Sequence, residues 1–358
     1  MIKIFFLPGA YDGCYYYRGY MPAIYGNMTC VTDFIGGQWD RDEMMKRALE
    51  ADVVVFQRPN DGYRVELMKL LKLKGKFIVF ENDDTYLPDK GVPLNMLGSD
   101  KARDLAIHLS ENLDEALKTA DLAIASTQTL AEEYRQKAKC PVVVRKNTVD
   151  PLDEWPRRTP VGRMRIGFIG SVSSNDDYTH IKDTIQWLDK NEKVTFVVLG
   201  HKRHDERYKG YEKDDEFWDT IKNIEWHDHI PATRYHKKLS DMQLHLALIP
   251  RKDNYFNRCK SNIKFLECSL QKIPVIAQGF TTGDSPYQLG KDKKYMQVVT
   301  KDEDWLPTII NTLNNYPEYA TLAEKAHDYV LEEYNIRKYA KDWRQIIEQH
   351  YENRHRTT

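Results

Sequence analysis

The sequence has few cysteines, and none of them forms a Cys-x-x-Cys pair. Five are scattered over 358 residues: Cys14, Cys30, Cys140, Cys259 and Cys268. An odd and dispersed set predicts neither a disulfide framework nor a zinc site, since both need closely matched partners. The cysteine content therefore favours a reducing cytosol.

Long apolar runs and an excess of charge of one sign are also missing. The first residues, MIKIFFLPGAYDG, place one lysine before a short apolar stretch that Pro8 interrupts, which is too short for a signal peptide or a membrane span. We therefore expect a soluble protein without stable membrane insertion. Because 53 lysines and arginines face 54 aspartates and glutamates, the net charge of -1 gives no overall attraction for polyanions.

Several motifs of nucleotide-binding and hydrolytic enzymes are absent. The sequence has no G-x-x-x-x-G-K-[ST] motif, and GAYDGCYYYRG near the N-terminus lacks the G-x-G-x-x-G spacing of a dinucleotide fold. No nucleophile elbow with a Ser-His-Asp order is present either. Kinase, dehydrogenase and serine-hydrolase interpretations therefore lose support.

What the sequence does contain is an alternation of short apolar runs and segments with a helical period. The runs predicted as strands are residues 2–8, 30–34, 52–57, 76–81, 121–126 and 141–147, followed after a polar, proline-bearing segment by 164–170, 194–200, 224–229, 244–250 and 274–278. Such an alternation predicts parallel sheets with helices on both faces. We expect an α/β protein with two doubly wound Rossmann-like domains facing across a cleft, at 1–155 and 156–337. A helix at about 338–354 is expected to dock back on the first domain.

Glycines and cations follow several of the predicted strands, at the end where ligands of open parallel sheets bind. They are Gly9, Gly13 and Arg18 in the first domain, and Gly170, Ser171, Lys202 and Arg203 in the second. Together they predict a site for a diphosphate, held by backbone amides and basic side chains. A plain strand-to-helix turn with aromatic packing is the alternative for the first of these loops.

The stretch NRCKSNIKFLECSLQKIPVIAQG, at 257–279, carries cations at its predicted helix start. Lys260 and Lys264 lie there, and Glu267 lies one turn further in. Helix N-termini carry partial positive charge and usually take acids, so cations at this place suggest an anionic guest. Residues three and four apart share a helix face, which would put all three side chains on one side. A solvated ladder of lysine and glutamate is the alternative.

The order of these segments resembles the retaining group 1 glycosyltransferases of the GT-B fold, which form glycosyltransferase family four. The segments that carry the resemblance are YYYRGYMP, FENDDTYLP, DLAIASTQTLAEEY, VRKNTVDPLDEW, RIGFIGS, FVVLG and the stretch at 257–279, which cover most of the chain in the family's order. The resemblance implies transfer of a hexosyl or pentosyl group from a UDP- or GDP-sugar to an acceptor hydroxyl. It places the donor in the second domain and the acceptor in the first.

The resemblance also implies roles for single residues. Glu267 matches the carboxylate that binds the donor ribose, and the helix start that faces the diphosphate comprises Lys260, Ser261, Asn262 and Lys264. Ile230 matches a loop that passes near the base. Cys259 stands where the family usually has a second glutamate that touches the donor sugar. Because a thiol cannot accept hydrogen bonds from sugar hydroxyls as a carboxylate does, the donor sugar stays open.

Two adjacent acids, Asp83 and Asp84, lie in FENDDTYLP at the end of a predicted strand. On the acceptor side of the cleft they are expected to orient or deprotonate the acceptor hydroxyl, and Arg18 is the third candidate catalytic residue. Binding of a divalent ion, or capping of the next helix or turn, are the alternatives. We expect transfer without a metal, because helix amides and basic side chains can stabilise the leaving diphosphate.

The acceptor is left open by the sequence. A glycan, a lipid-linked sugar or a cell-envelope polymer is the first interpretation. Some segments also resemble predicted phage enzymes, a few of which glycosylate hydroxymethylated bases of duplex DNA, and the basic-aromatic segments 201–213 and 234–238 would suit a phosphate backbone. A non-catalytic module that binds sugar nucleotides is a further alternative, favoured by Cys259. The expected location is the cytoplasm of a bacterium or of a phage-infected host.

Overall fold

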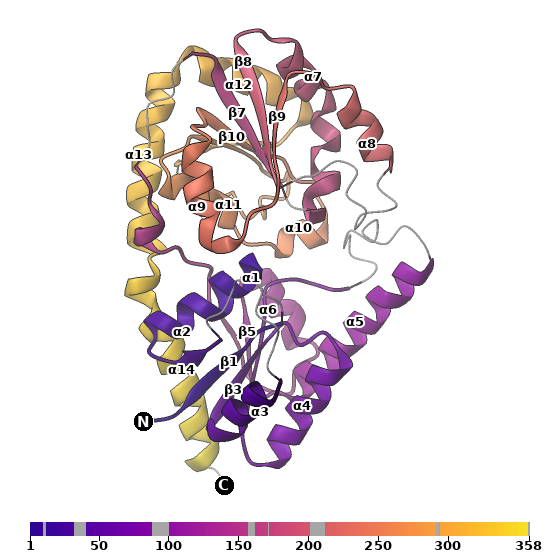
Figure 1. Cartoon of the computed structure of the whole chain (residues 1–358), viewed down its shortest axis with the longest axis vertical. Coiled ribbons are helices and arrows are strands. Elements are labelled where there is room, and N and C mark those ends of the chain that lie inside the picture. The colour runs from indigo at the N-terminus through magenta and orange to yellow at the C-terminus, as the bar shows by residue number, and fades with distance from the viewer. Residues whose placement is uncertain are drawn as a thin grey trace.

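The computed structural model describes residues 1–9, 12–31, 41–87, 100–156, 162–170, 172–200, 212–290, 292 and 294–356. Within these ranges the chain forms two parallel β-sheets, each covered by helices on both faces (Figure 1). The α/β class with two doubly wound domains, predicted from the alternation of apolar runs and helical segments, is therefore confirmed.

The first sheet has the strand order β2-β1-β3-β4-β5-β6. Its strands are β1 (Ile4–Leu7), β2 (Thr29–Cys30), β3 (Val53–Gln57), β4 (Phe77–Asn82), β5 (Leu122–Ala125) and β6 (Val142–Val144). The helical segments of this domain are α1 (Gly13–Tyr15), the π-helical turn η1 (Tyr16–Tyr20), α2 (Met21–Tyr25), α3 (Arg41–Glu50), α4 (Gly62–Leu73), α5 (Asp100–Thr119) and α6 (Gln128–Arg135). Every residue of β1, β3, β4 and β5 is buried, as expected for strands covered on both faces.

The second sheet has the order β12-β11-β10-β7-β8-β9. Its strands are β7 (Met164–Ile169), β8 (Val194–Leu199), β9 (Ile224–His227), β10 (Leu246–Ile249), β11 (Val275–Gln278) and β12 (Gln297–Val299). Its helical segments are η4 (Val172–Ile181), α7 (Lys182–Lys190), α8 (Glu212–Asp219), α9 (Ala232–Asp241), α10 (Tyr255–Cys259), α11 (Ile263–Leu270), η6 (Asp302–Asp304), α12 (Trp305–Asn314) and α13 (Tyr316–Glu333). The edge strand β12 is one that the apolar pattern did not predict.

The backbone crosses between the two sheets twice, and the two crossings lie side by side. The first follows β6 and contains the short 3₁₀ helix η3 (Pro151–Asp153); the second joins α13 to α14 (Ile336–Arg356). The backbone N–H of Val149 donates to the carbonyl of Tyr334 at 2.8 Å, and that of Ile336 donates to the carbonyl of Val149 at 2.9 Å. These two bonds fasten one crossing to the other.

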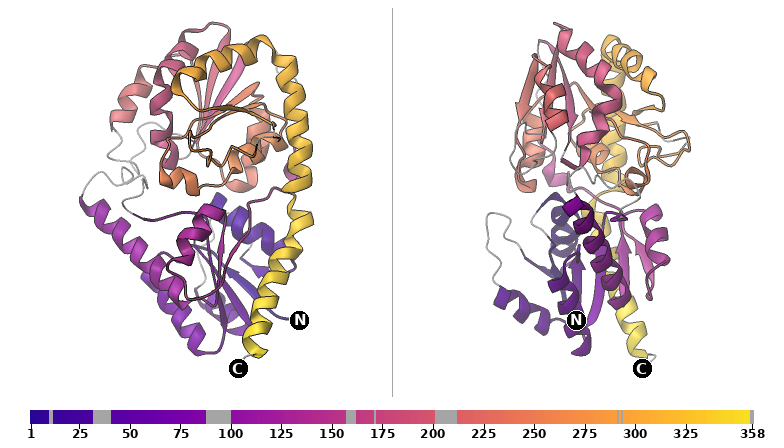
Figure 2. Two further views of the ribbon diagram at one scale, coloured as in Figure 1. Left: turned by 180° about the vertical axis from the view of Figure 1, so that it is seen from behind. Right: turned by 90° about the vertical axis from the view of Figure 1, so that its right-hand side faces the viewer.

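The last helix, α14, returns from the second domain and packs on the first sheet. Figures 1 and 2 show it beside this sheet, with both chain termini at the same end of the molecule. Trp343 and Ile347 of α14 lie in one apolar cluster with Ile4 and Phe6 of β1. The guanidinium of Arg344 donates to the carbonyl of Ile2 at 2.9 Å. Among the helices that the structure describes, none is long and apolar enough to cross a bilayer.

Replacing Ile347 by alanine should lower the free energy of unfolding by about 2 to 5 kcal/mol, because the lost side chain leaves a cavity against β1. Ile347 is completely buried. Urea denaturation measures the change, and Lys341→Ala, an exposed position of the same helix, is the control. Unchanged stability of the Ile347 variant would contradict the docking of α14 on the first sheet.

Candidate functional site

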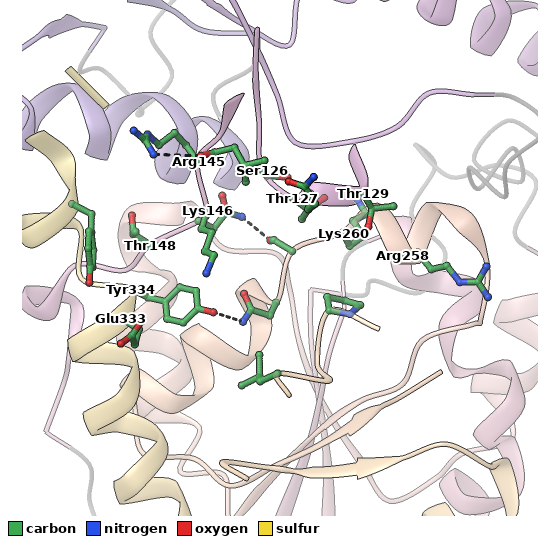
Figure 3. A pocket seen from close by; sticks show the side chains of 18 of the residues that line it. Ser126, Thr127, Thr129, Arg145, Lys146, Thr148, Arg258, Lys260, Glu333 and Tyr334 are labelled. Atoms are coloured by element: carbon green, nitrogen blue, oxygen red, sulfur yellow. Dashed lines mark hydrogen bonds between the residues drawn. The ribbon is translucent and has the colours of Figure 1, made fainter. Parts of the chain in front are cut away.

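A cavity of about 640 Å³ lies where the two domains meet. The first domain contributes the start of α6 and the loop after β6, and the second contributes the segment between α10 and α11 and the loop after β11. The junction of α13 and α14 closes one side. Figure 3 shows Lys146 and Tyr334 on one side of this cavity and Thr127 and Lys260 on the other. Its volume is within the range of small-molecule sites.

Three of the residues predicted to face the diphosphate line this cavity: Lys260, Ser261 and Asn262. They do not lie on the predicted helix, because α10 ends at Cys259 and α11 begins only at Ile263. Lys260 has an extended backbone, with φ -65° and ψ 152°. The prediction that Lys260 shares a helix face with Lys264 and Glu267 is therefore wrong. The helical spacing of apolar residues continues on both sides of the non-helical residues 260–262, so the spacing does not reveal that the helix is interrupted there.

The break between α10 and α11 is held by side chains of the first domain. Asn147 donates through Nδ2 to the hydroxyl of Ser261 at 2.7 Å, and the hydroxyl of Thr127 donates to the carbonyl of Cys259 at 2.9 Å. Both first-domain residues follow strands of the first sheet and line the cavity. The three non-helical residues of the break are thus fixed across the domain boundary.

Arg18 is fully buried beneath this boundary. Its Nε lies 2.6 Å from Oε1 of Glu81, and its Nη1 donates to Oδ1 of Asn147 at 3.0 Å and to the carbonyl of Arg145. Its guanidinium also lies over the ring of Trp343, 4.8 Å from the centroid. Arg18 is not among the residues that line the cavity; it supports Asn147, which in turn holds the break.

Basic side chains hold Asp83 and Asp84, and neither residue caps a helix that the structure describes. Arg58 contacts Oδ1 of Asp83 through Nε at 2.9 Å and Oδ2 of Asp84 through Nη2 at 2.5 Å. Nζ of Lys260 lies 2.5 Å from Oδ1 of Asp84. The acids expected on the acceptor side therefore lie against a cation expected on the donor side. Among the described residues, no group of three or more His, Cys, Asp or Glu side chains is placed to hold a metal.

Glu267 lies outside the cavity lining and is only 6% exposed. Its Oε1 accepts from the hydroxyl of Tyr17 at 2.8 Å and its Oε2 from that of Tyr235 at 2.9 Å. Tyr17 comes from the first domain, so this contact joins the two domains. Burial, and then the charge of Glu267, raise the pKa of Tyr17 well above its usual value, so both tyrosines remain hydrogen-bond donors.

Lys264 lies on the same helix as Glu267 and is partly buried. Burial lowers the pKa of Lys264, and the charge of Glu267 opposes this shift. The amine of Lys264 forms no hydrogen bond or ion pair with any residue that the structure describes. Glu267 acts on it only through its charge. A partly desolvated amine without a bonded partner is suited to an anionic ligand.

Cys259 is completely buried and packs in the apolar cluster of the first sheet, beside Tyr255. Burial raises the pKa of the Cys259 thiol to about 12. Its side chain is absent from the cavity lining, although Lys260, next to it, is present. In the family that the sequence resembles, this position holds a glutamate that binds the sugar. Here Cys259 instead packs against residues of the first domain.

The remaining predicted residues are dispersed. Gly9 is needed for close approach of β1 and β3, since a Cβ there would lie 2.5 Å from the carbonyl oxygen of Gln57, whereas a Cβ on Gly13 would meet open space. Gly170 donates its N–H to the carbonyl of Leu199, and Ile230 lies in the loop between β9 and α9. Ser171, Lys202 and Arg203 fall outside the described residues.

Sequence reasoning missed Arg58, Tyr17 and Asn147, which hold the predicted residues in place. Arg58 directly follows the predicted strand 52–57, and Asn147 is the last residue of the predicted strand 141–147, so their position at a carboxyl end was an available signal. Tyr17 lies in a π-helical turn, a form of helix often found at functional sites. The three consecutive tyrosines of YYYRGY gave no indication of which one faces the second domain.

No family model matches the sequence, and no curated protein matches it either. Solved structures share its fold. Sucrose-phosphate synthase from Thermosynechococcus elongatus is 11% identical, with 97% of this chain and 98% of that chain covered and a TM-score of 0.66. HepE from Anabaena in complex with UDP-glucose is 13% identical, with 98% and 100% covered and a TM-score of 0.67.

A putative UDP-N-acetylglucosamine 2-epimerase from Listeria monocytogenes is 12% identical, with 98% and 97% covered and a TM-score of 0.53. These similarities confirm the predicted GT-B fold over almost the whole chain. At such low identity they establish the fold alone, because one fold can serve different reactions.

Stability between pH 6 and 7 should depend on Glu81. Burial raises the pKa of Glu81 from 4.5 to about 7, although Arg18 opposes the shift. The folded state then holds a proton that the unfolded state has lost, so the free energy of unfolding should fall as pH rises from 4.5 to 7, by an amount on the order of 3 kcal/mol. Asp153, whose pKa burial raises to about 6, adds a change of the same sign at lower pH.

Urea denaturation at several pH values measures this slope. Glu81→Gln removes the titrating group, so it should flatten the curve between pH 6 and 7 and reduce the slope between pH 4.5 and 6 to the part that Asp153 contributes. A curve of unchanged steepness in the Glu81 variant would show that another group is responsible.

Proposed function

We propose that this protein is a retaining glycosyltransferase, which moves a sugar from a nucleotide-sugar donor to an acceptor hydroxyl. The observation that carries the proposal is the cavity between the two domains, lined by Lys260, Ser261 and Asn262 of the second domain and by the loops that follow β5 and β6 of the first. HepE shares the fold and contains UDP-glucose, so UDP-sugars are the first donors to test and GDP-sugars the second. The transferred group is a hexose or pentose.

In this proposal Lys264 and Lys260 stabilise the diphosphate as it leaves. Lys264, which like Glu267 lies outside the cavity lining, supplies a partly buried amine without a bonded partner among the described residues. Lys260 is held at the cavity by Asp84. Preorganised cations in a site with little water stabilise developing charge more strongly than cations in water do. Gly170, Ser171, Lys202 and Arg203 stay proposed as further donor contacts, and no metal is required.

Glu267 is proposed to anchor the ribose of the donor. Each of its carboxylate oxygens accepts from one tyrosine and keeps a second lone pair for a ribose hydroxyl. Tyr17 and Tyr235 fix the orientation of this carboxylate. On the acceptor side, Asp83 and Asp84 are proposed to orient the hydroxyl that attacks.

A second candidate is a module that binds sugar nucleotides without turnover. The burial of Cys259 favours it, because the carboxylate that touches the sugar in the resembled family is missing and nothing at this position replaces it in the cavity. Saturable binding without nucleotide release from any donor would support this candidate.

A glycan or cell-envelope acceptor is favoured over modified DNA. Of the basic segment 234–238, Tyr235 contacts Glu267, His236 is 3% exposed, and Lys237 forms an ion pair with Asp241. Tyr235 and His236 are therefore unavailable to a phosphate backbone, and Arg234 and Lys237 are the exposed cations of this segment. Most of the other basic segment, residues 201–211, lies outside the described residues.

The proposal predicts release of nucleotide from a nucleotide sugar. A panel of UDP- and GDP-sugars, with glycan acceptors and with modified and unmodified duplex DNA, identifies donor and acceptor class together. Lys264→Ala should lower kcat by about tenfold to a hundredfold with a smaller effect on donor Kd, as expected for a group that acts on the leaving diphosphate. Lys237→Ala, an exposed lysine of α9, is the matched control. Equal kcat for wild type and the Lys264 variant would exclude this role.

Turnover should continue when a chelator is added in excess. Lys260 and Lys264 would take the place of a divalent ion, and magnesium would need several oxygen ligands together with the substrate phosphates. The initial rate with and without chelator measures this directly. Complete loss of turnover, restored by an added divalent ion, would overturn the metal-free mechanism and make Asp83 and Asp84 candidate ligands.

A further inference from the structure

Arg58 occupies an unusual place and conformation in the first domain. It follows β3 directly. After β1 the chain adds β2 on one side of β1 and then β3 on the other, so β1 and β3 flank the topological switch point of the sheet. Ligands of such sheets bind beside this point. Its φ of 50° is in the left-handed region that side chains other than glycine rarely adopt. Such backbone strain persists where the surroundings fix it, and it is concentrated at functional sites.

The side chain of Arg58 lies among three carboxylates. Besides its contacts to Asp83 and Asp84, its Nη1 lies 3.6 Å from Oδ2 of Asp12. The side chains of Arg58, Asp83 and Asp84 are exposed by only 15%, 12% and 14%, so water screens their charges weakly. One arginine does not neutralise three acids, and the remaining negative charge faces the second domain, where Lys260 meets Asp84.

Lys260 has little in its own domain to fix it. It lies in the break between α10 and α11, and its amine also lies over the ring of Phe256, 4.2 Å from the centroid. A lysine side chain has many rotamers, and a contact with a ring face leaves most of them open. The carboxylate of Asp84 is the charged partner that selects one of them, and Arg58 holds the other oxygen of that carboxylate.

We propose that Arg58 is a positioning residue for Lys260 and acts through Asp84. Under the proposed function, on which this inference rests, Arg58 sets the place of a cation that stabilises the leaving diphosphate, without touching the substrate itself. The planar fork of the guanidinium is required, because two different nitrogens reach two different carboxylates. A lysine at position 58 would keep the charge but would not bridge Asp83 and Asp84.

The test compares Arg58→Gln and Arg58→Lys with wild type and with Arg47→Gln. Arg47 is an exposed arginine of α3 that forms an ion pair with Glu43. The first readout is the rate of reductive methylation of Lys260, measured by mass spectrometry with Lys69 and Lys237 as internal references. Both Arg58 variants should raise this rate several-fold by releasing Asp84 and Lys260, whereas Arg47→Gln should leave it unchanged. This readout needs neither donor nor turnover.

The second readout is kcat and donor KM with the donor found active. Arg58→Gln should lower kcat by about tenfold or more, as expected when one partner of a partly buried ion pair is removed, with a smaller change in KM. In a Lys260→Ala background the same change should have almost no further effect. If Arg58→Gln does not fold, Asp84→Asn opens the same link from the other side and should raise the methylation of Lys260 equally.

The two readouts separate the possible failures. Methylation of Lys260 that is unchanged in the Arg58 variants, or losses of kcat that simply add in the Lys260→Ala background, would overturn the positioning role. Absence of nucleotide release by the wild type from every donor would instead contradict the proposed function, while the methylation of Lys260 would still decide whether Arg58 positions it.

Discussion

The buried guanidinium of Arg18 holds together the part of the domain junction that the first sheet, the crossing after β6 and α14 contribute. A charge without access to water is costly unless its partners offset that cost, so the groups that contact this guanidinium are not free to move independently. These groups are Glu81 of β4, Asn147 of the crossing after β6, and Trp343 of α14. Asn147 extends the set into the second domain by its bond to Ser261. One side chain thus connects the first sheet, one domain crossing, the last helix and the cavity.

The fold was predictable from the sequence because buried parallel strands are continuous apolar runs, and those runs were separated by clear helical periods. The strand β12 was missed because only one of its three residues is buried, so it lacks such a run. The break at Lys260 was missed for the opposite reason, since apolar residues keep a helical period on both sides of it. The spacing of apolar residues identifies which side chains would share one face of a helix. It does not show whether the backbone between two helical turns remains helical.

The candidate site was predictable only in part. Lys260, Ser261 and Asn262 were placed by their position before a helix, and the structure brings them to the cavity. Arg58, Tyr17 and Asn147 hold predicted residues through contacts of 2.5 to 2.8 Å, with Asp84, Glu267 and Ser261 respectively. Each pair lies more than twenty positions apart in the chain, so no local pattern encodes these contacts. The burial of Cys259 likewise depends on the packing of α10 against α6, which is a property of the assembled domains.

The return of α14 to the first sheet has a consequence for how the protein is made. One face of that sheet, which includes Ile4 and Phe6, is covered by α14 from the far end of the chain. A ribosome delivers the sheet long before this helix, so the part of the face that α14 covers stays exposed while the second domain is synthesised. Transiently exposed apolar surface of this kind favours aggregation and chaperone binding. The nascent chain is therefore prone to aggregation until α14 has been synthesised and packs on the first sheet.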